Sequence, residues 1–126
     1  MGRNLLLSLT FICATFLCSC EMLEYHPYDV DISGERGVTY KNIDLIETAT
    51  AGHTSIRFAM ISDTQGYYDE TLDAVMDINR QNVDFVVHGG DLSDYGMARE
   101  FMNQRDIFNK LTVPYVCVIG NHDCLA

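Results

Sequence analysis

Three apolar runs, each ending in a short polar segment, constrain most what this chain can fold into. The runs "SIRFAMIS" (55–62), "VDFVVHG" (83–89) and "VPYVCVIG" (113–120) have the length and composition of buried strands. The segments between them, 68–81 and 97–111, carry apolar residues at helical spacing. Strands joined by crossover helices form a parallel, right-handed sheet. The sequence therefore predicts an α/β fold built on one βαβαβ unit.

A polar cluster follows each predicted strand directly. "SDTQG" (62–66) follows the first strand, "GGDLSDYG" (89–96) the second and "GNHD" (120–123) the third. Parallel strands end at the same edge of their sheet, which is where open α/β sheets bind ligands, so we expect the clusters to lie together. No G-x-G-x-x-G follows the first strand, which argues against a dinucleotide-binding protein, the competing class of this fold.

The three clusters supply ligand atoms for divalent cations. Asp63, Asp91 and Asn121 offer the oxygens that hard cations prefer, and His122 offers an imidazole for softer ones. Two metal ions that share one carboxylate can activate a hydroxide for attack on phosphorus. Taken singly, Asp63, Asp91 and Asp123 are equally explained as helix caps or turn residues. The ordered set of three clusters favours a metal site.

These clusters resemble, in the same order, the motifs D-x-H, G-D-x-x-D and G-N-H-[D/E] of the calcineurin-like metallophosphoesterases. The matching stretches are 63–65, 90–94 and 120–123, and the resemblance covers about residues 55–124. It implies that the βαβαβ unit is half of a four-layer αββα sandwich. It also implies a phosphomonoesterase or phosphodiesterase that uses a hydroxide activated by two divalent metal ions (Mn, Zn, Fe or Mg).

The resemblance implies four metal ligands. Asp63 and Gln65 would bind the first ion, Asp91 would bridge the two ions, and Asn121 would bind the second through its amide oxygen. Gln65 departs from the family pattern, which has histidine there, and an amide binds Zn²⁺ or Fe more weakly than imidazole does. We therefore expect a weakened first site. The alternative is a catalytically degenerate lipoprotein of the same fold that serves as a binding or structural module.

The resemblance also implies two catalytic residues. His122 would protonate or electrostatically stabilise the leaving oxygen, and Asp94 would hydrogen-bond His122 and keep it oriented and cationic. "GDLSDYG" lacks the Arg that follows the second Asp in protein Ser/Thr phosphatases, so we expect a small phosphoester substrate. His88 lies inside a predicted strand and is expected to be packed or hydrogen-bonded rather than a ligand.

The first twenty residues are typical of an export signal. Arg3 precedes a mostly apolar run, 5–17, that is short for a membrane span. The quartet "LCSC" (17–20) resembles a bacterial lipobox, so we expect Cys20 to be lipidated and to anchor the protein in the membrane of the cell envelope. A cleaved signal and a secreted or periplasmic protein are the alternative.

The rest of the chain divides into two parts. Residues 21–54 predict a tether with a short helix near 41–51, and residues 55–126 hold the motif-bearing unit. In the family, further metal-binding histidines follow the third motif on a second sheet, and this sequence continues for three residues after Asp123. We therefore expect the N-terminal half of a domain, with weak metal binding and little activity in this polypeptide alone.

Charge and cysteine content exclude two classes of protein. Acidic residues outnumber basic ones by 18 to 8 without a basic cluster, so nucleic acid is not an expected partner. Cys117 and Cys124 are the two cysteines outside the predicted signal and lipidation site, too few for a disulfide framework. We expect both to be small buried side chains, with a disulfide between them as the lesser alternative.

Overall fold

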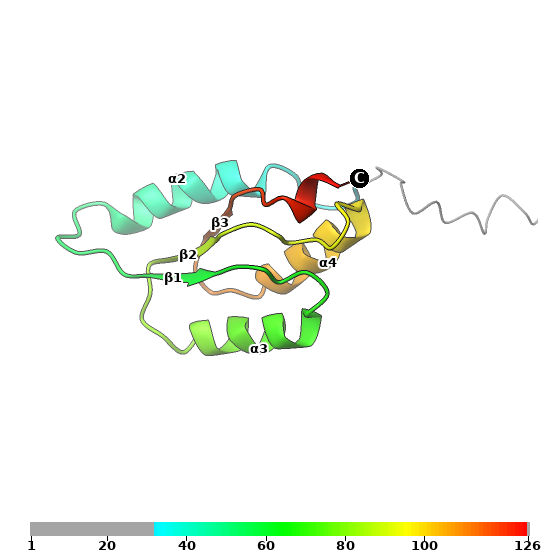
Figure 1. Ribbon diagram of the computed structural model, residues 1–126. Helices are drawn as coiled ribbons and strands as arrows, with labels where there is room; N and C mark the ends of the chain where they lie inside the picture. The colour runs from blue at the N-terminus through cyan, green and yellow to red at the C-terminus, as the bar shows by residue number, and fades with distance from the viewer. Residues whose placement is uncertain (1–31, 126) are drawn as a thin grey trace, which may run out of the picture.

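The computed structural model describes residues 32–125. In chain order the elements are α2 (Val38–Thr50), β1 (Phe58–Ile61), α3 (Tyr68–Ile78), β2 (Phe85–His88), α4 (Ala98–Phe108), β3 (Tyr115–Cys117) and the 3-10 helix η1 (His122–Cys124). The alternation of strand and helix from β1 to β3 confirms the predicted βαβαβ unit (Figure 1). The helix predicted near residues 41–51 is α2, which begins earlier than its apolar spacing indicated.

The three strands form a parallel sheet in the order β1-β2-β3. Ala59 pairs with Val86, and Val86 with Tyr115. Each strand is shorter than the apolar run that predicted it, because apolar residues continue beyond the paired ladder. After β3, for example, the N–H of Val118 still donates to the carbonyl of His88, but Ile119 is already exposed. The runs located the strands correctly and overestimated their length.

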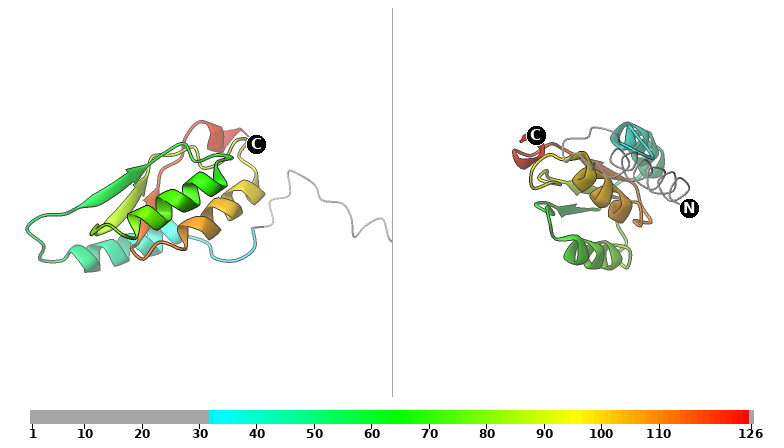
Figure 2. Two further views of the ribbon diagram at one scale, coloured as in Figure 1. Left: turned by 90° about the horizontal axis from the view of Figure 1, so that it is seen from below. Right: turned by 90° about the vertical axis from the view of Figure 1, so that its right-hand side faces the viewer.

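One face of the sheet carries the hydrophobic core. Val86 and Tyr115 point to the same face, where they pack with Val75 of α3 and Phe108 of α4. The rings of Phe108 and Tyr115 are in contact, with centroids 5.4 Å apart. Seen from below (Figure 2, left), α3 and α4 lie side by side in front of the sheet, and α2 lies behind it. The two crossover helices therefore cover the same face.

The opposite face of the sheet is apolar and open. Phe58 and Met60 of β1 are 53% and 69% exposed. Phe58 stacks on Phe85 of β2, with ring centroids 5.5 Å apart. On this side α2 packs beside β3, where Asn42 Nδ2 donates to the carbonyl of Tyr115 at 2.7 Å. The arrangement agrees with half of a layered α/β sandwich.

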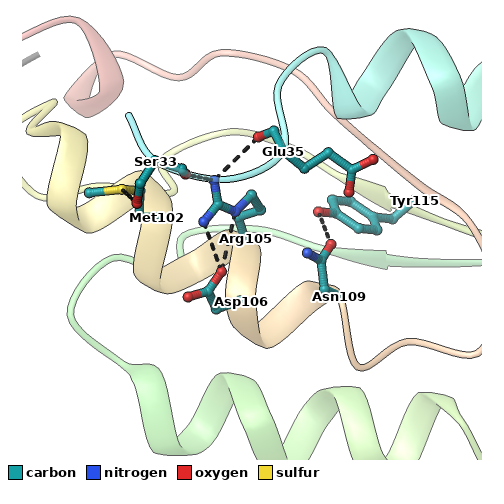
Figure 3. A network of polar contacts seen from close by, with 7 residues as sticks. All are labelled: Ser33, Glu35, Met102, Arg105, Asp106, Asn109 and Tyr115. Carbon is teal, nitrogen blue, oxygen red and sulfur yellow. Dashed lines mark hydrogen bonds and ion pairs between the residues drawn. The ribbon is translucent and has the colours of Figure 1, made fainter. Parts of the chain in front are cut away.

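Residues 32–37 are tied to α4 by Arg105 (Figure 3). Its guanidinium donates to the carbonyls of Ser33 at 2.6 Å and Glu35 at 3.2 Å, and it pairs with Asp106 at 3.0 Å. Gly34 has a φ of +83°, and a Cβ there would come within 3.1 Å of the guanidinium. Glycine at this position thus lets the segment pass close to Arg105.

Predictions for the first segment lie outside the described residues. This holds for the signal sequence and for lipidation at Cys20. Within residues 32–125, no helix combines the length and apolarity needed to cross a membrane. Cys117 and Cys124 are free thiols; the first is half-buried, as expected for a packing residue, but the second is exposed, which corrects that prediction.

Candidate metal centre

The three motif-bearing loops meet at the carboxyl edge of the sheet, as predicted. The N–H groups of Asp63 and Thr64 donate to the carbonyls of Gly90 and Asp91, each at 3.1 Å. The third loop joins them because the N–H of His122 donates to Asp91 Oδ1 at 2.9 Å. The loops after β1, β2 and β3 therefore form one hydrogen-bonded surface.

Asp63 and Asp91 adopt an uncommon backbone conformation. Their φ angles are +57° and +56°, in the left-handed region that residues with a side chain seldom occupy. Such conformations concentrate at functional sites, where surrounding contacts hold them in place. Here the contacts are close: a Cβ on Gly120 would lie 2.1 Å from Asp91 Oδ1, and one on Gly90 would lie 2.7 Å from the nitrogen of Gly120. Only glycine fits at these two positions.

Asp123 links the second loop to the third. Its Oδ2 accepts the N–H groups of Asp91 at 3.0 Å and Gly120 at 2.9 Å. Its Oδ1 accepts both the N–H and the hydroxyl of Ser93, at 2.9 and 3.0 Å. Partial burial raises the pKa of this carboxyl, but the donors of Gly120 and Ser93 outweigh burial and hold the pKa below its ordinary value. A cap or a turn was one explanation of Asp123 taken singly; in the structure its carboxylate joins the second and third loops.

His88 is buried between the first two loops. The N–H of Gly90 donates to its Nδ1 at 3.1 Å, so Nε2 carries the ring proton and donates to Thr64 Oγ1 at 2.9 Å. Burial lowers the pKa of the imidazole, against the opposing effect of nearby carboxylates that include Asp123 and Asp63, and this favours the neutral ring. Phe108 packs edge-on against it. A packed, hydrogen-bonded histidine is what the sequence predicted.

His122 contacts Asp94 through a different atom from the one expected. Its Nδ1 lies 3.0 Å from the backbone carbonyl oxygen of Asp94, not from the carboxylate. The carboxylate is directed to the first loop, since a Cβ on Gly66 would lie 3.0 Å from Asp94 Oδ2. The carbonyl accepts a hydrogen bond from Nδ1–H, which leaves Nε2 as the nitrogen available to give or take a proton. Asp94 thus orients His122 through its backbone carbonyl, and its negatively charged carboxylate faces the first loop instead.

The four predicted ligands come from all three loops. Asp63 and Asn121 are exposed at the edge, and Asp91 and Gln65 are half-buried. Ser62 Oγ donates to Asp63 Oδ2. Gln65 Oε1 is buried without a hydrogen-bond partner in the described chain, which fits a ligand atom better than a packing residue.

This donor set fits a hard divalent cation. It consists of carboxylate and amide oxygens, which suit Mg²⁺ or Mn²⁺ better than Zn²⁺. Across residues 32–125, no three His, Cys, Asp or Glu side chains gather as a metal ion would require. The predicted ligand set contains four residues because it includes the amides of Gln65 and Asn121.

The fold and the loops define an α/β protein with an oxygen-rich candidate metal centre at the edge of its sheet. The family model of the calcineurin-like phosphoesterases matches residues 56–126, more than half of the chain. The chain therefore belongs to the calcineurin-like phosphoesterase family, as its three motifs predicted. Members of this family typically use divalent metal ions, and membership indicates metal-dependent hydrolysis of phosphoesters. No curated protein and no solved structure matches the chain.

Proposed function

We propose that the protein hydrolyses a small phosphomonoester or phosphodiester with two divalent metal ions held by Asp63, Gln65, Asp91 and Asn121. The observation that carries the proposal is the joining of the three motif loops through backbone hydrogen bonds and the Asp91 carboxylate. When bound, the ions would activate water and neutralise charge on the phosphate. The excess of acidic residues supports a small substrate over nucleic acid.

The chain's own residues would orient the groups that react. Asp91 is fixed by the His122 N–H, so its carboxylate has one defined position between the second and third loops. His122 is held through Nδ1, and its Nε2 is the atom that would give a proton to the leaving oxygen. The first and second loops are paired at Thr64, which limits the separation of Asp63 and Asp91.

Asp91→Asn in the full-length protein tests this proposal. Mn²⁺ affinity, measured by calorimetry, and turnover of a chromogenic phosphodiester should fall together, by about 100-fold or more, because a ligand matters at least as much as the groups that orient ligands. Asp73→Asn, an exposed acid on α3, is the matched control and should change neither. Equal metal affinity and turnover in wild type and Asp91→Asn would refute the ligand assignment.

Gln65→His separates the proposed hydrolase from the degenerate module. An imidazole at position 65 restores the ligand that the family pattern has, so Zn²⁺ or Fe²⁺ should bind more tightly while the fold is kept. A wild type that is folded but binds no metal and has no turnover would support the alternative, a binding or structural module. The amide at position 65 is the observation that keeps this alternative open.

We further propose that the protein is exported and anchored to the membrane of the bacterial cell envelope through lipidated Cys20. The support is in the sequence alone: a basic residue, an apolar run and the quartet "LCSC" at residues 17–20. The alternative is a secreted or periplasmic protein.

A further inference from the structure

Three polar side chains are buried in the first loop and beneath it, where apolar residues would be expected. Thr64 is 4% exposed, and His88 and Gln104 are fully buried. Buried polar groups weaken a core unless hydrogen bonds satisfy them. Thr64 is also the residue between Asp63 and Gln65, two of the candidate metal ligands.

The side chains of His88 and Gln104 are both directed to Thr64. Gln104 Nε2 donates to the Thr64 carbonyl at 2.5 Å, and His88 Nε2 donates to Thr64 Oγ1 at 2.9 Å. The Thr64 N–H donates to the Asp91 carbonyl at 3.1 Å. Thr64 is thereby held from α4, from β2 and from the second loop at the same time.

His88 connects the two loops that carry the carboxylates. Its Nε2 holds Thr64, next to Asp63, while its Nδ1 accepts the N–H of Gly90, next to Asp91. A single imidazole therefore bridges the neighbours of Asp63 and Asp91, two residues that both have positive φ, and adds to the direct backbone bonds between their loops. Conformations of that kind persist only where several contacts determine them.

Gln104 is difficult to explain by packing. Its Oε1 is buried without a hydrogen-bond partner in the described chain, so the side chain leaves one polar atom unsatisfied while its Nε2 holds Thr64. An apolar side chain of the same length would fill this position of α4 without that penalty. The donor to Thr64 is the feature that such a side chain would lack.

We propose that Thr64, His88 and Gln104, the buried Thr64 network, position Asp63 and Gln65 for metal binding. The inference rests on the proposed metal function. None of the three residues is a ligand in that proposal, so they are positioning residues: they hold the first loop in the conformation that presents its ligands. Groups that orient metal ligands typically change metal affinity by about 10–100-fold when removed.

Two substitutions of Thr64 distinguish positioning from packing. Thr64→Val keeps the shape and removes the hydroxyl that pairs with His88; Thr64→Ser keeps the hydroxyl and removes a methyl group. In the full-length protein we expect Thr64→Val to weaken Mn²⁺ binding by about tenfold or more, and Thr64→Ser to stay within about threefold of wild type. A packing role predicts the reverse order, because the valine preserves the buried volume, and that order would overturn the proposal.

Gln104→Met tests the contact from α4 independently. Methionine keeps the length of the side chain and removes both the donor and the unsatisfied Oε1, so Mn²⁺ affinity should fall by about tenfold while the urea midpoint stays the same or rises. Gln81→Met, an exposed glutamine after α3, is the matched control and should change neither quantity. Unchanged Mn²⁺ affinity in both Gln104→Met and Thr64→Val would overturn the proposal.

Amide hydrogen exchange separates failure of this inference from failure of the proposed function. If the wild type binds no Mn²⁺, the proposed metal function fails. Exchange of the backbone N–H at position 64 then decides whether the network holds the loop. Exchange at least about tenfold faster in Thr64→Val and Gln104→Met than in Gln81→Met supports a loop-holding network. Equal exchange in all three variants contradicts it.

Discussion

At the scale of single residues, Asp123 contributes most to joining the loops. Each of its two carboxylate oxygens accepts two hydrogen bonds. In Asp123→Asn, the NH₂ group that replaces one oxygen must therefore face two donors. We expect the free energy of unfolding, from urea titration, to fall by about 2 kcal/mol, the typical cost of disturbing hydrogen bonds to a charged group. Asp73→Asn on the exposed side of α3 should change it by less than about 0.5 kcal/mol. Equal changes in both variants would show that Asp123 does not hold the loops.

The motifs predicted which loops meet at the edge of the sheet, but not how each residue is held. Asp63, Asp91 and Asn121 follow from their places after apolar runs. The four donors to Asp123 are mostly backbone groups, and the carbonyl of Asp94 replaces its carboxylate as the partner of His122. Backbone donors and left-handed φ angles depend on how neighbouring loops pack, and residue types at a fixed spacing do not record them.

At the scale of elements, the sequence predicted the type and order of strands and helices better than their ends. Hydrophobic periodicity identifies a segment that must be buried, whereas a strand ends where its neighbour stops pairing with it. Run 113–120 shows the difference, because only Tyr115–Cys117 pair with β2 as a strand. The residues that follow are still apolar, but they lead into the loop of the third motif.

Arg105 of α4 should hold the segment that precedes α2, residues 32–37, in its observed conformation. Arg105→Met removes the donors to the Ser33 and Glu35 carbonyls, so backbone amides in 32–37 should exchange faster, while those of β2 should not change. Hydrogen exchange with mass spectrometry measures both regions at once. Arg99→Met, an exposed arginine on the same helix, is the control. Unchanged exchange in 32–37 would mean that other contacts hold this segment.

At the scale of the whole molecule, the open face of the sheet should control solubility. Phe58 and Met60 expose apolar surface on adjacent positions of that face, and such patches promote association. We expect the 126-residue polypeptide to self-associate, and Phe58→Thr with Met60→Thr to reduce this in light scattering. Tyr40→Thr, which changes an aromatic residue 80% exposed on α2, should have a smaller effect. If the double variant associates as strongly as wild type, self-association must be driven by a surface other than Phe58 and Met60.

The proposed membrane anchor is a second property of the whole molecule. The net charge of the chain helps its test, because it removes electrostatic attraction as another reason for membrane binding. A formal net charge of −10 opposes binding to anionic lipids, so electrostatic attraction would not place this protein on a bacterial membrane. Acyl chains on Cys20 would, because each buried CH₂ contributes about 0.8 kcal/mol. The wild type should therefore enter the detergent phase in a phase-separation assay, and Cys20→Ala should remain in the aqueous phase. Cys18→Ala, two residues before the thiol proposed to be lipidated, should behave like wild type. An aqueous wild type would contradict lipidation and favour the secreted or periplasmic form.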